Sequence, residues 1–291
     1  MYLKEIRNIY HLELDLLFPR EEVDSFFYMV IEHYLGLERF VLALDPNMVV
    51  PKEKEAPLFR ALGELRQERP IQYVLGKAHF CEMDFKVNED VLIPRPETEE
   101  LVYWILDLLH NSGSTGLAGG EGLRILDICT GSGCIAIALA KNLPLAKVSA
   151  IDISKGALRL SEQNARLNKV EVGFAEADAL CLEEFGGMYD IIVSNPPYVR
   201  EMEKRSMRNN VLKYEPEMAL FVADDDPLLF YKSIVRFATT HLNKGGMLFL
   251  EINQYLGKET EGLLGRDIFS GVELKKDMYG NDRMIKGIIS E

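Results

Sequence analysis

Residues 123–133 decide the fold of this chain, and they read Leu-Arg-Ile-Leu-Asp-Ile-Cys-Thr-Gly-Ser-Gly. An apolar segment runs here into small residues, an apolar helical pattern follows over 133–141, and a second apolar segment, 147–151, ends at Asp152. The order strand, glycine loop, helix, strand and acid is that of a βαβ unit whose loop approaches a nucleotide. We expect Asp152 to accept hydrogen bonds from ribose hydroxyls; the alternative is a tight turn with a capping aspartate.

The rest of the C-terminal part continues this rhythm. Apolar segments at 123–127, 147–151, 170–175, 190–194 and 247–252 predict strands, and 133–141, 155–168 and 228–241 predict helices between them. Such alternation predicts an α/β fold, a mostly parallel sheet covered on both faces. Residues 271–277 and 282–289 flank too short a gap for a helix, so we expect them to form a final antiparallel hairpin.

The N-terminal part differs in character. Apolar residues recur every three or four positions over 21–35 and 53–69, and prolines separate these segments, so residues 1–75 predict a small bundle of four or five helices. Residues 76–93 alternate and predict a β-hairpin linker. Residues 94–291 form the large domain; it opens with a helix over 98–110 that buries Trp104, and a flexible Gly/Ser-rich loop follows at 111–122.

Composition excludes several classes of protein. The 291 residues include 33 basic and 46 acidic ones, a net charge of −13, which disfavours stable nucleic-acid binding because phosphate contacts need a basic surface. The four cysteines form no CxxC pair and the five histidines are scattered, so we expect neither disulfides nor a metal site. No signal peptide or membrane span is apparent, and we expect a cytoplasmic monomer.

The glycine loop resembles motif I of the S-adenosylmethionine-dependent methyltransferases. It has the form D-x-x-x-G-x-G, from Asp127 to Gly133, and not the G-x-G-x-x-G of NAD enzymes. That family usually has glycine where this chain has Cys129, and a side chain there is strained if the backbone is left-handed. An aspartate near Asp178, in Ala177-Asp178-Ala179, binds the adenine amino group in such enzymes; the alternative is a solvated loop aspartate.

The sharpest motif is Ser194-Asn195-Pro196-Pro197-Tyr198, after an apolar strand. Two prolines remove backbone donors, so the loop offers mainly acceptors: the Asn195 side-chain oxygen and carbonyls such as that of Pro196. A planar –NH2 group carries two donors that match this pair, and Tyr198 offers an aromatic face to the substrate or to a sulfonium charge. The alternative is a turn that ends a strand.

Asn-Pro-Pro-Tyr occurs in methyltransferases of adenine N6, guanine N2 and glutamine N5, and further segments are similar to one branch of them. That branch is the HemK or PrmC family, the glutamine N5-methyltransferases of peptide chain release factors. The similar segments are 73–76 (YVLG), 91–99 (VLIPRPETE), 124–127 (RILD), 131–136 (GSGCIA), 195–198 (NPPY), 214–216 (YEP) and 280–283 (GNDR).

The resemblance implies a seven-stranded, Rossmann-like class I methyltransferase domain behind an N-terminal helical, substrate-docking domain. It implies methyl transfer from S-adenosylmethionine to the glutamine of the Gly-Gly-Gln motif in bacterial release factors. Family members often have an aromatic residue where this chain has Ala179. The implied substrate contacts are Asn195, Pro196, Pro197 and Tyr198. The implied cofactor contacts are Cys129, Thr130, Gly131, Ser132, Gly133, Asp152, Asp178, Ala179 and Asn195.

Two other functions share some of these features. A DNA adenine or rRNA guanine methyltransferase shares the tetrapeptide, but residues 1–80 hold 10 basic and 13 acidic residues and make a poor nucleic-acid domain. A non-catalytic cofactor-binding scaffold would not need Asn-Pro-Pro-Tyr. One stretch, 200–213, has five basic and two acidic residues. It predicts either a docking surface for a release factor or a solvated mobile loop.

Overall fold

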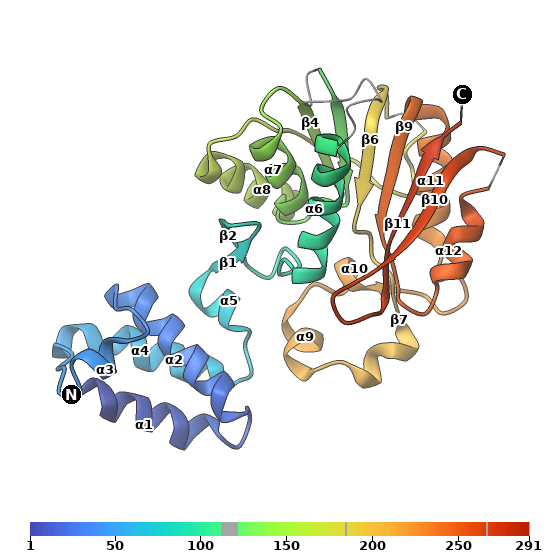
Figure 1. The fold of residues 1–291 in the computed structure, drawn as a ribbon. Coiled ribbons are helices and arrows are strands. Elements are labelled where there is room, and N and C mark those ends of the chain that lie inside the picture. The colour runs from blue at the N-terminus through green and yellow to red at the C-terminus, as the bar shows by residue number, and fades with distance from the viewer. Residues whose placement is uncertain (112–121, 184, 266, 291) are drawn as a thin grey trace. The chain divides into compact units, whose positions relative to one another are not determined.

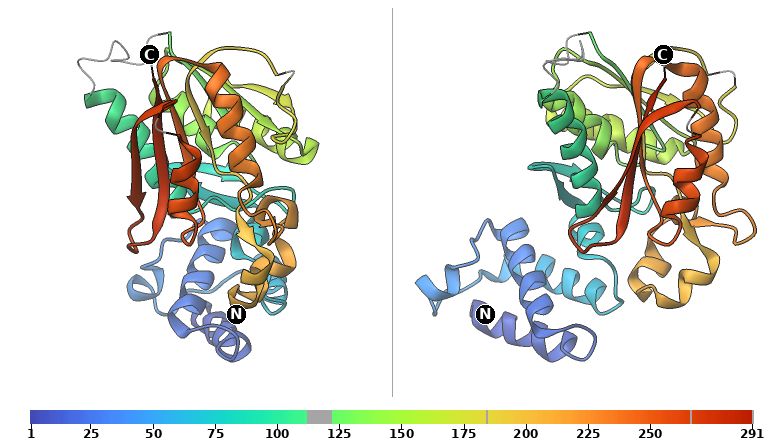
Figure 2. Two further views of the ribbon diagram at one scale, coloured as in Figure 1. Left: turned by 90° about the vertical axis from the view of Figure 1, so that its right-hand side faces the viewer. Right: turned by 45° about the vertical axis from the view of Figure 1, so that its right-hand side comes forward.

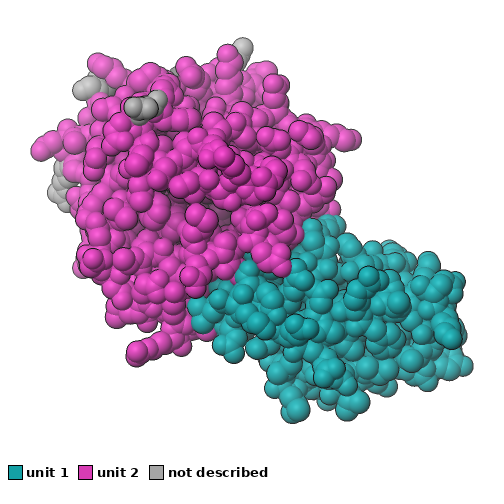
Figure 3. Space-filling view, turned by 180° about the vertical axis from the view of Figure 1, so that it is seen from behind, with its two compact units in different colours: residues 1–77, 208–214 teal, residues 78–207, 215–291 magenta. Residues whose placement is uncertain are grey.

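The computed structural model describes residues 1–111, 122–183, 185–265 and 267–290. The loop predicted at 111–122 therefore lies almost wholly outside the described residues. The chain divides into two compact units, shown in separate colours in Figure 3. The first unit is Met1–Lys77 with Arg208–Tyr214, and the second is Ala78–Met207 with Glu215–Glu291.

The first unit contains the predicted helical bundle. Helix α1 places Leu3, Ile6, Tyr10 and Leu14 on one buried face, and the Tyr10 hydroxyl donates to the carbonyl of Leu58 at 2.6 Å. This spacing of three and four residues is what one apolar helical stripe requires. Its helices are α1 (Leu3–Leu14), α2 (Arg20–Leu35), α3 (Val41–Leu44), α4 (Lys52–Leu65) and α5 (Ile71–Leu75).

A segment distant in sequence completes this unit. Helix α9 (Asn209–Tyr214) packs with the bundle: the Tyr214 hydroxyl donates to the carbonyl of Gln67 at 2.8 Å, and Arg208 pairs with Glu22 at 3.3 Å. Sequence periodicity did not predict this contact. The basic stretch is therefore not an irregular loop, because it forms the 3₁₀ helix η2 (Glu201–Ser206) and then α9.

The second unit begins with the predicted hairpin, strands β1 (Lys77–Phe80) and β2 (Met83–Lys86). Its two-residue turn, Cys81 and Glu82, has φ values of 46° and 60°. Two consecutive positive φ values are those of a type I′ turn, which matches the twist of paired strands.

The central sheet has seven strands in the order β10-β11-β9-β6-β3-β4-β5, as Figure 1 shows in part. β3, β4, β5, β6 and β9 run parallel, whereas β11 pairs antiparallel with both β9 and β10. Their bounds are β3 (Arg124–Ile128), β4 (Lys147–Asp152), β5 (Gly173–Glu176), β6 (Tyr189–Ser194), β9 (Leu242–Glu251), β10 (Phe269–Lys276) and β11 (Asp282–Ile289). The predicted mostly parallel sheet with a final hairpin is confirmed.

Helices cover both faces of the sheet (Figures 1 and 2). One core joins the sheet to α6 (Pro96–Asn111) and α7 (Cys134–Asn142), with α8 (Lys155–Asn168) beside them. The other core joins the opposite face to α11 (Leu229–His241) and to residues at the end of α12 (Gly257–Leu263). Trp104 is 6% exposed in the first core, as predicted. Consecutive side chains of each strand face opposite cores, so the strands read as continuous apolar runs.

The strand order reverses beside β3, and this reversal positions the site. From β3 the chain moves outward through β4 to β5, then returns to β6 on the other side of β3. Loops at the carboxyl ends of β3 and β6 therefore diverge and leave a crevice, the usual ligand position in open α/β sheets.

Among the described helices, none is long and apolar enough to cross a membrane.

Some predicted bounds were wrong. β5 begins at Gly173, not at residue 170, and β9 begins at Leu242, five residues before the predicted start. Residues 199–222 form the short strands β7 (Val199–Arg200) and β8 (Phe221–Val222), η2, α9 and α10 (Glu217–Leu220), which no periodicity indicated. Elements this short have too few residues to show a period.

Candidate active site

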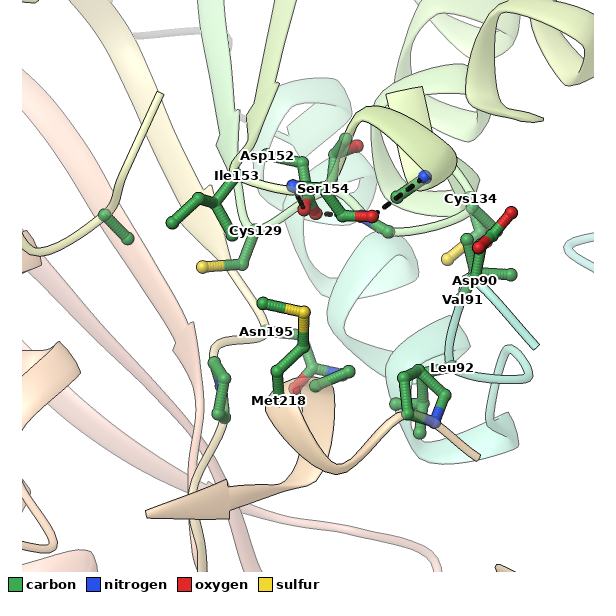
Figure 4. Close-up of a pocket in the computed structure, with 18 of the residues that line it drawn as sticks. Asp90, Val91, Leu92, Cys129, Cys134, Asp152, Ile153, Ser154, Asn195 and Met218 are labelled. Carbon is green, nitrogen blue, oxygen red and sulfur yellow. Dashed lines mark hydrogen bonds between the residues drawn. The ribbon is translucent and has the colours of Figure 1, made fainter. Parts of the chain in front are cut away.

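A pocket of about 340 Å³ lies at the carboxyl ends of the parallel strands, within the second unit (Figure 4). This volume is in the range of small-molecule sites. Loops after β3, β4, β5 and β6 line it, together with the segments before α6 and around α10. The lining residues include 90–95, Thr98, 129–132, 152–154, 177–180, Asn195, Pro197, Met218 and Phe221.

The glycine loop and Asp152 are bonded to each other. The Gly131 N–H donates to Asp152 Oδ2 at 2.8 Å, and the Ser154 N–H donates to Asp152 Oδ1 at 2.9 Å. A carboxylate oxygen has two lone pairs, so each Asp152 oxygen keeps one acceptor position. Burial raises the pKa of Asp152, and the backbone N–H groups oppose that rise. Asp152 lines the pocket as a pre-oriented double acceptor.

Asn164 of α8 supports the other end of this loop. It is fully buried, and its Nδ2 donates to the carbonyls of Ser132 and Lys86 at 2.9 and 3.0 Å. Its Oδ1 accepts from the Lys86 N–H at 2.7 Å. One side chain thus ties the glycine loop to the end of strand β2. Asn164 was not predicted to shape the site, although an asparagine inside a helix is a sign of a specific polar contact.

Cys129 adopts a left-handed backbone conformation, with φ 62°, which is strained for a residue that has a side chain. Burial raises the pKa of its thiol well above the ordinary value, so the thiol stays neutral. Figure 4 shows Cys129, Ile153 and Met218 around one end of the pocket. The sulfur groups of Cys129 and Met218 therefore contribute apolar, polarizable surface there.

Asp178 and Ala179 also line the pocket, after the end of β5. Asp178 Oδ1 accepts from the Leu180 N–H at 2.8 Å, which holds this loop, and Ala179 is 7% exposed in the second core. Ala179 therefore offers only a methyl group to this part of the pocket.

The Asn-Pro-Pro-Tyr loop enters the pocket from the end of β6. Asn195 and Pro197 line the pocket, whereas Pro196 is buried and Tyr198 is not among the lining residues. Asn195 Nδ2 donates to Thr98 Oγ1 at 3.1 Å, and no described residue donates to Asn195 Oδ1. The Tyr198 hydroxyl donates to Glu251 Oε1 at 2.8 Å, so this side chain anchors the loop. The expectation that its ring faces the substrate gains no support.

An ion pair holds the opposite wall. Arg95 and Glu215 lie 2.5 Å apart, Glu215 is 4% exposed, and its other oxygen accepts from the Ile93 N–H at 3.2 Å. This pair joins the segment before α6 to the segment that carries Met218. The only cation of the described lining is thereby neutralised, while Asp90, Asp152 and Asp178 remain. The pocket is therefore electrostatically suited to a cationic ligand.

Gly133 closes the loop and is the N-cap residue of α7. Its φ is 81°, and a Cβ placed there would lie 2.9 Å from both Ile137 Cδ1 and Ser161 Cβ. Gly133→Ala should cost about 2–4 kcal/mol of unfolding free energy, since left-handed strain and overpacking add. Thermal unfolding checks this. Gly262→Ala in α12, where no atom lies within 4 Å of the new Cβ, should leave the unfolding temperature near that of the wild type; equal losses would contradict the argument.

Asp127 lies behind the loop, fully buried. Its Oδ2 accepts from Thr130 Oγ1 at 2.6 Å, while its Oδ1 has no partner among the described residues. Burial raises its pKa to about 7. A raised carboxyl pKa means that the folded state binds this proton more tightly than the unfolded chain. Its contribution to stability is therefore complete below pH ~4 and is lost as the pH rises through 7.

As the pH rises from 4 to 8, the wild type should therefore lose about 3–4 kcal/mol of unfolding free energy relative to Asp127→Asn. Urea denaturation at several pH values measures it. Asp107→Asn, an exposed change of the same charge, should follow the wild-type curve. A pH-independent difference for Asp127→Asn would contradict the buried, protonatable carboxyl.

Several residues that shape the site were not predicted in a functional role. Thr98, Glu215 and Arg283 lie in segments that carried the family resemblance, but no role followed from their spacing. Glu251 had one signal: it is a carboxylate in an otherwise apolar strand, and such a residue is rarely buried without partners. No signal in the sequence pointed to Asn253, whose Nδ2 donates to the carbonyl of Tyr198 at 2.9 Å.

Comparison with known proteins agrees with this geometry. The family model "Methyltransferase small domain" matches residues 114–217, and "PrmC N-terminal domain" matches residues 18–76. A protein of Flavobacterium psychrophilum named release factor glutamine methyltransferase is 48% identical over 98% of this chain and 99% of its own length. One of the same name from Bacteroides thetaiotaomicron is 41% identical over 92% of this chain and 94% of its own.

Among solved structures, a methyltransferase from Pyrococcus furiosus superposes with a TM-score of 0.55 at 19% identity, over 78% of this chain and all of that one. This likeness shows the fold alone. The near-complete match to the curated relatives shows the family. The chain belongs to the release factor glutamine methyltransferases, a family of S-adenosylmethionine-dependent methyltransferases.

Proposed function

We propose that this chain transfers a methyl group from S-adenosylmethionine to the side-chain amide nitrogen of the glutamine in the Gly-Gly-Gln motif of bacterial release factors. One observation carries the proposal. An acceptor-rich Asn-Pro-Pro-Tyr loop and a nucleoside-type carboxylate, Asp152, line the same pocket from the ends of β6 and β4. The names of the curated relatives support the substrate.

The pocket fits the methyl donor on three counts. Asp152 keeps two acceptor positions for the ribose hydroxyls after its bonds to Gly131 and Ser154. Residues 129–133 form the small-residue loop, and Asp178 and Ala179, for which the family resemblance implies adenine contacts, line the same pocket. The carboxylates of the lining suit the positive sulfonium. S-adenosylmethionine supplies, when bound, an electrophilic methyl carbon attached to that sulfur.

The chain's own residues then orient the acceptor nitrogen. Asn195 Oδ1 and the Pro196 carbonyl accept the two hydrogens of the glutamine amide. This aims the nitrogen lone pair at the methyl carbon, and it raises the electron density on an otherwise poor nucleophile. Bound S-adenosylmethionine would give up its methyl group to this nitrogen and leave as S-adenosylhomocysteine, and the methylated nitrogen would release one proton to water. No histidine is present in the described lining, so catalysis rests on orientation and preorganised acceptors.

We assign release-factor docking to the helical unit, including the basic segment that joins it. Three of the five basic residues between positions 200 and 213 already have acidic partners: Arg200 with Glu203, Lys204 with Glu201 and Arg208 with Glu22. This leaves little free positive charge for a phosphate backbone, which favours a protein partner. We place the enzyme in the cytoplasm, where release factors act, as a monomer.

A labelled-methyl assay tests the proposed function. Purified protein is incubated with S-adenosylmethionine carrying a labelled methyl group and, separately, with a release factor, duplex DNA and ribosomal RNA. We expect label in the release factor alone. Label confined to either nucleic acid would overturn the substrate assignment, and no label in any arm would indicate a non-catalytic role.

A further inference from the structure

A buried chain of hydrogen bonds lies behind Asn195. Asn195 Nδ2 donates to Thr98 Oγ1 at 3.1 Å, and Thr98 Oγ1 donates to Glu251 Oε2 at 2.6 Å. The second oxygen of the same carboxylate, Oε1, accepts from the Tyr198 hydroxyl at 2.8 Å. Thr98 and Glu251 are 2% and 1% exposed, so the bond between these two side chains is shielded from water. Three elements meet here: α6, the loop after β6, and β9.

With Glu251 ionised, the donors and acceptors of this hydrogen-bond chain admit only one arrangement. An ionised carboxylate has no proton to give, so both hydroxyls must donate to Glu251. A threonine hydroxyl has a single proton, and once it points to Glu251 only lone pairs face Asn195. Asn195 must therefore turn its –NH2 group toward Thr98. Its Oδ1 is then left without a donor among the described residues and remains free to accept.

Two hydroxyls and the Arg283 guanidinium surround the Glu251 carboxyl. Burial and Glu97 raise the pKa of Glu251 above its ordinary value, although Thr98, Tyr198 and Arg283 oppose the rise. Arg283 Nη1 donates to the Tyr198 hydroxyl at 3.3 Å, and Asp277 accepts from Arg283 Nε at 3.1 Å. The Tyr198 hydroxyl thus accepts from a cation and donates to an anion. A protonated Glu251 would lose this polarity and could reverse the direction of the Thr98 bond.

We infer that Thr98 and Glu251 are positioning residues that hold the Asn195 carboxamide with its oxygen, and not its nitrogen, available to the pocket. A carboxamide rotated by 180° has nearly the same shape but presents two donors. Facing a substrate –NH2 group, the rotated form would set donors against donors. The inference rests on the proposed function in one respect only, namely that the group that donates to Asn195 Oδ1 is the glutamine amide.

Variants of Thr98 test the inference by kinetics. Thr98→Val keeps the shape and removes the hydroxyl, so we expect kcat toward a release factor to fall by at least ~10-fold, by analogy with loss of a preorganised hydrogen bond. The Kd for S-adenosylmethionine, measured by calorimetry, should change less than ~3-fold. Thr98→Ser restores the hydroxyl and should recover most of kcat. Thr260→Val removes another fully buried hydroxyl, in α12, and should leave kcat unchanged.

A second readout does not depend on the substrate. In protein labelled with ¹⁵N-asparagine, the Asn195 side-chain signals are those missing from Asn195→Asp. We expect one Asn195 amide proton to exchange with water more slowly than those of exposed asparagines, and to lose this protection in Thr98→Val but not in Thr98→Ser. Unchanged protection together with unchanged kcat in Thr98→Val would overturn the inference. Failure of the wild type to methylate release factor would overturn the proposed function alone, since the exchange result would still decide the orientation.

Discussion

Asn195→Ala will lower kcat for methyl transfer to a release factor by ~30- to 1000-fold, which corresponds to ~2–4 kcal/mol for loss of one preorganised hydrogen bond. The side-chain oxygen accepts from the substrate amide in our account, so its loss leaves the nitrogen badly aimed and less electron-rich. Single-turnover kinetics with saturating S-adenosylmethionine measure the effect directly.

The affinity of this variant for S-adenosylmethionine should remain within a few-fold of the wild type, because the Asp152 contacts are untouched. Asn142→Ala, an exposed change at the end of α7, serves as the matched control and should be fully active. Near-normal turnover of Asn195→Ala would remove the Asn-Pro-Pro-Tyr loop from the mechanism.

Asp152→Ala will weaken S-adenosylmethionine binding by ~100-fold or more, since hydrogen bonds to a charged group are worth ~1.5–3 kcal/mol each and two are lost. The Gly131 N–H donates to Asp152 at 2.8 Å, so the variant also removes a hydrogen bond that supports the glycine loop. Calorimetric titration with S-adenosylmethionine measures the change in Kd.

Glu176→Ala is the matched control for that experiment. Glu176 lies opposite Asp152 in the β4–β5 register, also at a strand end, but it is exposed and pairs with Lys155. Its removal should leave Kd unchanged. If both variants weakened binding equally, general charge and not the Asp152 geometry would explain the affinity.

Much of the fold could be predicted from the sequence because each helix or strand shows its own spacing of apolar residues. Alternation of apolar strands with amphipathic helices indicated the parallel sheet, and the short gap around Gly280 indicated the final hairpin, which β10 and β11 confirm. The strand order could not be derived from periodicity. It depends on which strands pair across the sheet, and the family resemblance implied only that the sheet has seven strands.

The site was predictable where one segment carries its own geometry. The glycine loop, Asp152 and Asn195 each follow a strand end, and parallel strands bring such ends together. Thr98 and Glu251 were not predictable as positioning residues, because they are 153 positions apart and their partnership exists only after α6 packs on the sheet. The packing of Arg208–Tyr214 with the helical bundle is of the same kind.

The position of the transferred methyl group decides whether the Asn195 loop directs methylation to the glutamine. A release factor is incubated with the protein and S-adenosylmethionine, digested, and sequenced by tandem mass spectrometry, with Asn195→Ala protein as the blank. We expect the added mass of one methyl group on the side chain of the glutamine in Gly-Gly-Gln, and no added mass with the variant. A methyl group on any other residue, or an unmodified glutamine after exhaustive reaction with the wild type, would contradict it.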